Sequence, residues 1–242
     1  MPLDPTWLRP DWPGVTAFMT TRGPNFGRKA GDPEQVRANR ARLAEQLGAR
    51  PIFLDQVHGA DVVRLQAGWH DDNAPGADAA VSTDPNLAVA ILVADCLPVL
   101  FAAPGGVAGA HAGWRGLAAG VLENTVAELC AAAGCEPRDV KAWLGACIGP
   151  QAFEVGPEVV AAFGRKPLER DQPGFLYRPN PEPRWRADLP LLARERLMSI
   201  NVTRISGGGW CTLTDDSRFF SFRGESLGRP CGRMAACISL GR

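Results

Sequence analysis

The architecture of this chain depends most on one apolar segment, Leu87-Ala88-Val89-Ala90-Ile91-Leu92-Val93-Ala94, which stops abruptly at Asp95-Cys96. A continuous apolar run without alternation is typical of a strand that is buried on both faces. Such a strand has packed elements above and below its sheet, so replacing Leu92 with alanine is expected to destabilise the fold by roughly 2 to 5 kcal/mol. The segment therefore predicts a layered core with a thiol at the end of a deeply buried strand.

Further strands and helices surround this segment along the chain. Residues 97–102 and 107–111 flank Pro104-Gly105-Gly106, which predicts a hairpin. Other strand-like runs lie at residues 15–20, 51–57, 61–65, 77–83 and 141–144, near 202 and 219, and at 234–240. Helices are predicted over residues 32–48, over 117–133, after Pro157 and over 188–199, and the proline-rich residues 167–190 are expected to form a surface excursion. This interspersed order predicts an α/β fold (α+β-like) with a mixed sheet, in one domain spanning residues 1–242.

Composition and local patterns exclude several classes of function. Lys plus Arg and Asp plus Glu each number 26, so no net charge attracts nucleic acid or an anionic membrane surface. The sequence contains neither a signal peptide nor an apolar run of about 18 residues, which predicts a cytoplasmic protein without membrane contact. The seven cysteines form no Cys-x-x-Cys pair, so reduced thiols are expected instead of a disulfide framework. No Walker loop and no dinucleotide fingerprint is present.

Two histidines and one cysteine occupy the ends of predicted strands. His58 follows the run 51–57, Cys96 follows the run 87–94, and His111 ends the second hairpin strand. Two imidazoles and a thiolate are the ligand types of a catalytic zinc site whose fourth position stays open. Their spacing matches no compact zinc finger, so the site requires a fold that brings the three strand ends together. Two alternatives use the same residues: a metal-free dyad of Cys96 and His111, or ordinary core histidines with a buried thiol.

The sequence also contains candidate anion-binding arginines. Gly113-Trp114-Arg115-Gly116 leads from the second hairpin strand into a helix, where free backbone N–H groups and Arg115 favour a phosphate or a carboxylate. A tight turn with the tryptophan in the core and the arginine in solvent is an equal alternative. Arg22 and Arg223 each follow a strand-like run and are further candidates. The third histidine, His70, lies in a polar stretch and is expected at the surface.

Three motifs at these positions resemble a known family. The signatures of the laccase-domain family, which includes the bacterial YfiH and YlmD proteins, are matched in order and spacing by Gln56-Val57-His58-Gly59, Ala94-Asp95-Cys96-Leu97-Pro98-Val99 and Ala110-His111-Ala112-Gly113-Trp114-Arg115-Gly116. Weaker matches at Thr20-Thr21-Arg22 and Gly232-Arg233-Met234 help to extend the resemblance over nearly the whole chain.

The resemblance implies a single domain of mixed β-sheets packed face to face between helices, with zinc held by the equivalents of His58, Cys96 and His111. Members of this family are described as purine nucleoside phosphorylases that also deaminate adenosine, as copper polyphenol oxidases, and in one branch as amidases that edit peptidoglycan precursors. A multicopper oxidase needs many imidazoles, and three histidines in the whole chain disfavour that activity and make copper the less favoured metal. Zinc lowers the pKa of water, which suits both deamination and amide hydrolysis.

Phosphorolysis depends instead on cations that place phosphate under the ribose C1′, so the resemblance implies phosphate-binding roles for Arg22 and Arg115 and a catalytic role for Arg223. The family commonly has Arg-Arg-Asp where this chain has Arg223-Gly224-Glu225. If the second arginine of that motif is the catalytic one, Arg223 or Arg229 has to replace it. We expect a zinc-dependent enzyme that uses phosphate and purine nucleosides such as adenosine, inosine and methylthioadenosine; amide hydrolysis in a peptidoglycan precursor is the alternative. The expected catalytic residues are His58, Cys96, His111 and Arg223.

Overall fold

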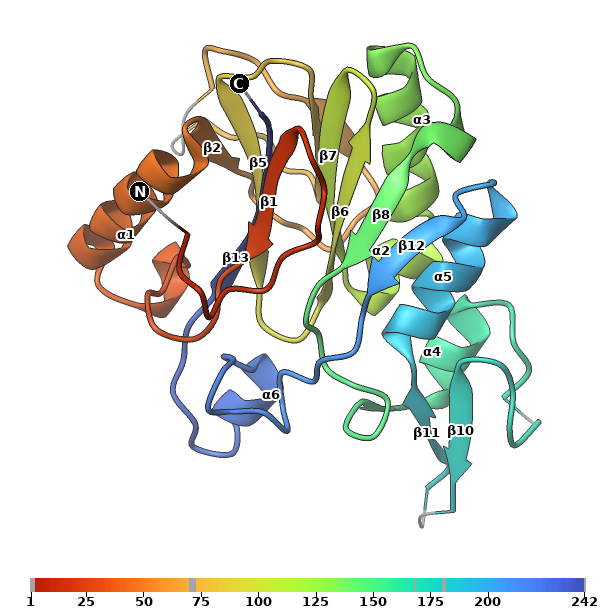
Figure 1. Ribbon diagram of the computed structural model, residues 1–242. Coiled ribbons are helices and arrows are strands. Elements are labelled where there is room, and N and C mark those ends of the chain that lie inside the picture. Colours follow the sequence, from red (N-terminus) through yellow and green to blue (C-terminus); the bar gives the residue numbers. More distant parts are fainter. Residues whose placement is uncertain (1–2, 70–72, 168, 180–181, 242) are drawn as a thin grey trace.

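The computed structural model describes residues 3–69, 73–167, 169–179 and 182–241. Figure 1 shows two central sheets between layers of helices, with a small hairpin projecting from one end. His70, which the sequence places in a polar stretch, lies outside the described residues. Among the described residues, no helix combines the length and the apolar character needed to span a membrane.

One central sheet has four strands in the order β1 (Val15–Met19), β13 (Met234–Leu240), β5 (Leu87–Val93) and β2 (Arg50–Phe53). The other has six strands in the order β12 (Arg204–Gly207), β8 (Lys141–Leu144), β6 (Leu97–Ala103), β7 (Gly106–Ala112), β4 (Ala79–Ser82) and β3 (Val62–Arg64). The pairs β2–β5, β3–β4 and β8–β12 are parallel, whereas the other pairs in these sheets are antiparallel. Both sheets are therefore mixed, and β6 and β7 form the predicted hairpin.

The two sheets pack face to face through apolar side chains. Val89 and Ile91 of β5 lie fully buried in the core between the sheets, together with Leu100 of β6. Gly109 of β7 permits a close approach, because a Cβ at this position would lie 2.9 Å from Val89 Cγ1 and 3.2 Å from Ile91 Cγ1. The opposite face of β5, with Ala88 and Ala90, packs against a helix layer. The apolar segment is thus buried on both faces, as its sequence predicts.

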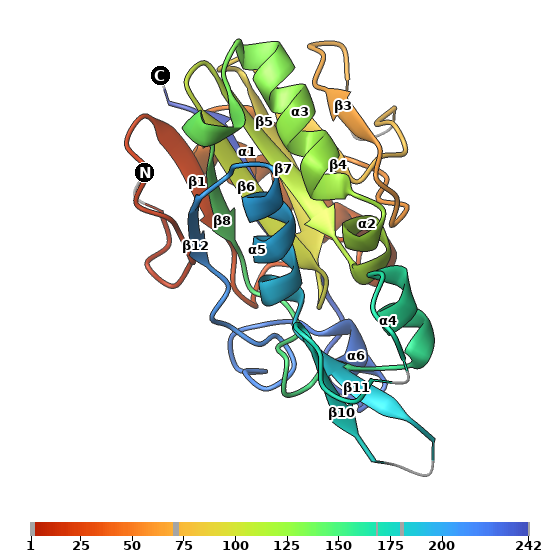
Figure 2. The same ribbon diagram turned by 90° about the vertical axis from the view of Figure 1, so that its right-hand side faces the viewer.

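Helices cover the outer face of each sheet (Figures 1 and 2). Helix α1 (Pro33–Leu47) covers the four-stranded sheet; it begins where the Asp32 side chain accepts a hydrogen bond from Glu34 N, and ends at Gly48. Helices α3 (Val121–Ala133) and α5 (Leu189–Ser199) cover the six-stranded sheet. Shorter elements are α2 (Trp114–Ala118), α4 (Pro157–Ala162), α6 (Phe222–Glu225), and the 3-10 turns η1 (Arg28–Ala30) and η2 (Pro137–Asp139). The predicted class, mixed sheets packed face to face between helices, is confirmed.

Three local predictions differ from the structure, and a fourth, the surface excursion over residues 167–190, is incomplete. The helix predicted over residues 117–133 is two helices, because Gly120 adopts a φ of 93° between α2 and α3. Phe219 is buried but belongs to no strand. The proline-rich stretch contains a hairpin of β10 (Phe175–Arg178) and β11 (Arg184–Ala187), which pairs with β9 (Glu154–Val155). Leu92 is only partly buried, so its replacement by alanine should cost less than the range expected for a core leucine.

Candidate metal centre

The two histidines and the cysteine come together at one end of the sheets. One ligand atom from each of His58, Cys96 and His111 lies within 4.8 Å of the others. The two imidazole rings meet edge to face, with centroids 4.9 Å apart and planes 78° apart. His111 is buried, Cys96 is partly buried and His58 is exposed, so the cluster has an accessible side.

Strand order explains this convergence. Chain residues 94–96 cross from β5 of one sheet to β6 of the other, and Asp95 makes the crossing with a φ of 81°. In the β6–β7 ladder, Pro98 pairs with His111 and Leu97 pairs with Ala112. Cys96 therefore lies beside the end of β7, where His111 is located. The ligands are distant in sequence but adjacent in the packed sheets.

Asp78, which directly precedes β4, holds both histidines in place. Its side chain is completely buried, and Oδ1 lies 2.8 Å from His111 Nδ1. Its two carboxylate oxygens also accept hydrogen bonds from three successive backbone N–H groups, those of Val57 (3.1 Å), His58 (2.9 Å) and Gly59 (2.6 Å). His58 has a φ of 62°, a conformation that is uncommon for residues other than glycine. The carboxylate thus stabilises the turn that carries His58 and orients the His111 ring.

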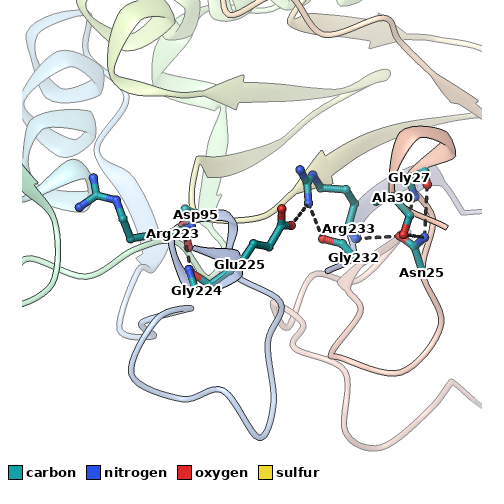
Figure 3. Close-up of polar contacts among 10 residues, drawn as sticks. Asn25, Gly27, Ala30, Asp95, Arg223, Gly224, Glu225, Gly232 and Arg233 are labelled. Carbon is teal, nitrogen blue, oxygen red and sulfur yellow. Dashed lines mark hydrogen bonds and ion pairs between the residues drawn. The ribbon is translucent and has the colours of Figure 1, made fainter. Parts of the chain in front are cut away.

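Asp95 connects the Cys96 turn to two further loops. Its Oδ1 accepts a hydrogen bond from Thr212 Oγ1 at 2.5 Å. Its Oδ2 accepts hydrogen bonds from Ser221 Oγ at 3.0 Å and from Arg223 N at 2.7 Å, and Figure 3 shows Asp95 beside the backbone of Arg223 and Gly224. This carboxylate therefore fixes α6 next to the turn that carries Cys96.

Two glycines of the third motif allow the elements to approach one another. A Cβ on Gly113 would lie 3.0 Å from Cys96 Sγ and 3.3 Å from His58 Cδ2. A Cβ on Gly116 would lie 2.5 Å from the carbonyl oxygen of Gly59, a distance that real Cβ atoms do not reach. The start of α2 consequently packs directly against the ligand cluster, and a side chain at either position would displace it.

Charge interactions within the cluster oppose the effects of burial. Burial raises the pKa of the Cys96 thiol, but hydrogen bonds and charge from His111 and His58 outweigh it and lower that pKa to about 6. Burial lowers the pKa of His111, but the Asp78 carboxylate and the Cys96 thiolate outweigh it and raise that pKa to about 9. Without a metal, the cluster at neutral pH is therefore a thiolate beside an imidazolium.

The donor set fits a zinc ion. One sulfur and two imidazole nitrogens are ligands that zinc prefers, at about 2.0 to 2.3 Å from the metal. The contact between Asp78 and His111 Nδ1 leaves Nε2 as the donor atom, and a carboxylate on the other ring nitrogen is the usual companion of a zinc-binding histidine. Several coppers do not fit, because the whole chain has three histidines.

The cluster faces a pocket of about 720 Å³, a volume typical of small-molecule sites. Arg223 lines this pocket together with the three candidate ligands, and further lining cations are Arg28, Lys29, Arg40 and Arg233. Arg40 is buried and donates to the carbonyl oxygen of Phe26, whereas Arg233 pairs with Glu225 at 2.6 Å. These side chains give the pocket a cationic wall although the whole chain has no net charge.

The other candidate arginines lie elsewhere. Arg22 and Arg115 are exposed and are not among the residues that line the pocket. The guanidinium of Arg22 donates to the backbone carbonyl of Asp216, and that of Arg115 lies 4.4 Å from the ring centroid of Trp114. Arg229 donates to the carbonyl of Leu213 and also lies outside the lining. Of the two arginines that could replace the one at the Gly224 position, Arg223 is the one at the pocket.

Sequence reasoning missed two residues that organise the site. Asp78 was recognisable as a lone carboxylate within the apolar run 77–81, where an ionised group has to be paired. Gln56 continues the β2–β5 ladder beyond the end of β2, because its side chain donates to Leu92 O at 3.0 Å and accepts from Leu92 N at 2.7 Å. The one signal for Gln56 in the sequence is its position in the first motif, two residues before His58.

Comparison with known proteins places the chain in a family. The family described as multi-copper polyphenol oxidoreductase laccase matches residues 14–241. The purine nucleoside phosphorylase PA4543 of Pseudomonas aeruginosa is 44% identical over 250 residues, covering 97% of this chain and 98% of the relative. The purine nucleoside phosphorylase YfiH of Escherichia coli is 42% identical, covering 96% of this chain and 97% of the relative.

Solved structures agree with the sequence relatives. The crystal structure of the YfiH protein of Bacillus licheniformis matches with a TM-score of 0.87 and 29% identity, covering 98% of this chain and 97% of that chain. The fold, the order of the motifs and the extent of these matches lead to one conclusion. The chain belongs to the laccase-domain family, as its three central motifs indicate.

Proposed function

We propose that this protein is a zinc-dependent purine nucleoside phosphorylase that also deaminates adenosine, with adenosine, inosine and methylthioadenosine-type nucleosides as substrates. One observation carries the proposal: His58, Cys96 and His111 converge at a pocket that Arg223 also lines. Curated relatives that match almost the whole chain are named purine nucleoside phosphorylases, which supports the same conclusion. We assign the metal to these three residues and phosphate to the cationic wall.

In phosphorolysis, a phosphate oxygen forms a bond to the ribose C1′ while the bond from C1′ to the purine nitrogen breaks, and the purine leaves with the electron pair and gains a proton. Two observations support a phosphate-binding role for Arg223: its backbone is anchored by Asp95, and the residue lines the pocket. Arg22 and Arg115 lie outside the lining, and phosphate contacts from them would require a different arrangement of their loops. Zinc, when bound, supplies a Lewis acid that stabilises negative charge and lowers the pKa of water, as deamination requires.

A second candidate, hydrolysis of an amide bond in a peptidoglycan precursor, is favoured by a different observation. Cys96 Sγ lies within 4.8 Å of a ring nitrogen of each of His111 and His58, and contacts with these residues outweigh burial and lower the pKa of the thiol to about 6, which supports a thiolate nucleophile. In this reaction Cys96 Sγ bonds to the amide carbon, the amine leaves with a proton from His111, and water then hydrolyses the thioester. Without zinc, the same residues would serve this chemistry.

The two candidates differ in their substrates and in their need for phosphate. Zinc-loaded protein incubated with adenosine should release adenine only when phosphate is present, and should form inosine with or without phosphate. Chromatography of the products measures both reactions. Cys96→Ala should abolish both activities and tight zinc binding while the protein stays folded. Cys135 is a partly buried cysteine outside the cluster, so Cys135→Ala should leave the two activities and zinc binding unchanged.

Failure of the zinc-loaded protein to convert any nucleoside would reject the first candidate, and cleavage of a peptidoglycan-type amide by the zinc-free protein would support the second. Full activity in Cys96→Ala would contradict both.

A further inference from the structure

Four aromatic rings line the pocket, and each has an arginine within about 6 Å, the range of cation–π attraction. The guanidinium carbon lies 3.9 Å from the ring centroid for Arg40 over Phe53 and 4.4 Å for Arg115 over Trp114. The corresponding distances are 6.0 Å for Arg223 over Phe153 and 5.6 Å for Arg233 over Phe222. Each ring therefore has a cationic neighbour. The rings differ in how much of their surface is exposed to solvent.

Phe222 is the ring of this group that is left open. Phe53 and Phe153 are 3% and 8% exposed and belong to the packed interior, and Trp114 is partly buried. Phe222 is 62% exposed although it lies at the pocket. An exposed phenylalanine contributes little to folding, because its apolar surface remains in contact with water. A flat ligand that covers the ring would remove that surface from water and would gain stacking energy.

The position of Phe222 relative to the metal centre is fixed by the backbone on both of its sides. Ser221 Oγ and Arg223 N both donate to Asp95 Oδ2, and Asp95 directly precedes Cys96. Ser221 also caps α6 by accepting a hydrogen bond from Gly224 N. The short helix is thus attached to the turn that carries a metal ligand, and its first residue cannot move far without breaking these contacts.

Arg233 is held in place independently of the ring. Its guanidinium donates to Glu225 at 2.6 Å and to the carbonyl of Gly232 at 2.8 Å, while its backbone N donates to Asn25 Oδ1 at 2.8 Å. Figure 3 shows this chain of contacts running from α6 to the loop of Asn25, on the side opposite to the Arg223 side chain. The cation beside Phe222 is therefore oriented before any ligand binds.

We propose that Phe222 is the stacking surface for the purine base and so determines the preference of this site for nucleosides with a flat aromatic base. The assignment rests on the proposed function, since it names the residue that recognises one part of that substrate. A purine is flat and apolar on both faces, which matches an exposed ring in the lining of a pocket that also contains the candidate metal ligands and the cations. Phosphate and ribose then face the cationic wall and the metal ligands.

Steady-state kinetics of ring variants test this assignment. In Phe222→Leu, which keeps apolar volume but removes the ring, KM for adenosine and for inosine should rise roughly 5- to 150-fold, the range for loss of one base-aromatic stack. The kcat, the KM for phosphate and the zinc content should stay within about twofold, because phosphate and metal contact other residues. Phe222→Tyr keeps the aromatic ring, so it should have the wild-type KM for both nucleosides. Leu227→Ala is the matched control and should leave both KM values unchanged, since Leu227 is 65% exposed in the turn after α6 but does not line the pocket.

The outcomes separate this assignment from the proposed function. Unchanged KM for both nucleosides in Phe222→Leu, with an active wild-type enzyme, would overturn the stacking role and leave the phosphorylase intact. An equal rise of the nucleoside KM in Phe222→Leu and Phe222→Tyr would also overturn it. Tyrosine keeps the aromatic ring and leucine does not, so equal effects would mean that the ring itself is not what binds the base. Absence of nucleoside turnover in the wild-type protein would overturn the proposed function itself.

Discussion

Asp78 is the residue that most directly couples the two histidines. Replacing it with asparagine keeps the shape of the side chain but removes the charge that orients His111 and places an amide group among three backbone N–H donors. Loss of a carboxylate behind a zinc-binding histidine typically costs about 10- to 100-fold in metal affinity. We expect a loss of this size for zinc in Asp78→Asn, measured by competition with a chromophoric chelator. Asp61→Asn, at an exposed position nearby in sequence, is the control, and equal zinc affinity in both variants would refute the role.

Gly113 offers a second test at the residue scale. An alanine Cβ would press on Cys96 Sγ at 3.0 Å and on His58 Cδ2 at 3.3 Å, so one of the two ligands has to shift by a few tenths of an ångström. We expect Gly113→Ala to weaken zinc binding and nucleoside turnover together, with little change in thermal unfolding. Gly209→Ala, where no atom lies within 4 Å of the added carbon, should leave both properties unchanged. Normal zinc affinity in Gly113→Ala would show that the cluster tolerates the added carbon.

Protonation of the cluster predicts how zinc binding depends on pH. The pKa of His111 in the metal-free protein is raised to about 9, and that of Cys96 is lowered to about 6. A zinc ligand has to be deprotonated, so binding near pH 7.5 should release about one proton, from His111. Affinity should fall about tenfold per pH unit from pH 9 towards 6, and more steeply below pH 6 as the thiolate is also protonated. Calorimetry in two buffers of different ionisation enthalpy measures the number of released protons. Release of almost no protons at pH 7.5 would contradict this pair of pKa values.

At the scale of elements, the contact between β5 and β7 holds the two sheets together. Ile91 is completely buried in that contact, whereas its neighbour Leu92 is partly buried and lines the pocket. Ile91→Ala should therefore reduce the free energy of unfolding by about 2 to 5 kcal/mol through cavity formation, and Leu92→Ala should cost less. Urea unfolding followed by tryptophan fluorescence measures both. An equal or larger cost for Leu92→Ala would mean that the sheet interface is not the main source of stability.

The sequence predicted those elements whose pattern is local. The apolar segment of β5 and the hairpin turn Pro104-Gly105-Gly106 were sufficient to predict β5, β6 and β7. The break at Gly120 was missed, because the apolar side of the predicted helix continues across it and only the φ of 93° stops the helix. The β10–β11 hairpin was missed because its strands lie in a stretch rich in proline and arginine.

At the scale of the whole molecule, the candidate ligands could be chosen from the sequence, but their proximity in the folded protein could not be derived from it. Residue types and strand ends selected His58, Cys96 and His111, and family resemblance added the expectation of zinc and of sheets packed face to face. The crossing of the chain between the two sheets at Asp95 places Cys96 beside His111, and the Asp78 carboxylate holds the turn that carries His58 against them. Phosphate-binding arginines were harder to choose, because an arginine that follows a strand can reach many places. Of three such candidates, Arg223 lies at the pocket.

X-ray absorption at the zinc K-edge of the purified protein tests the metal centre most directly. We predict one zinc per chain with one sulfur at about 2.3 Å, two imidazole nitrogens at about 2.0 Å and one further light atom. The sulfur shell should vanish in Cys96→Ala. A protein that binds no zinc, or a zinc shell that lacks sulfur in the wild type, would contradict a centre built from His58, Cys96 and His111.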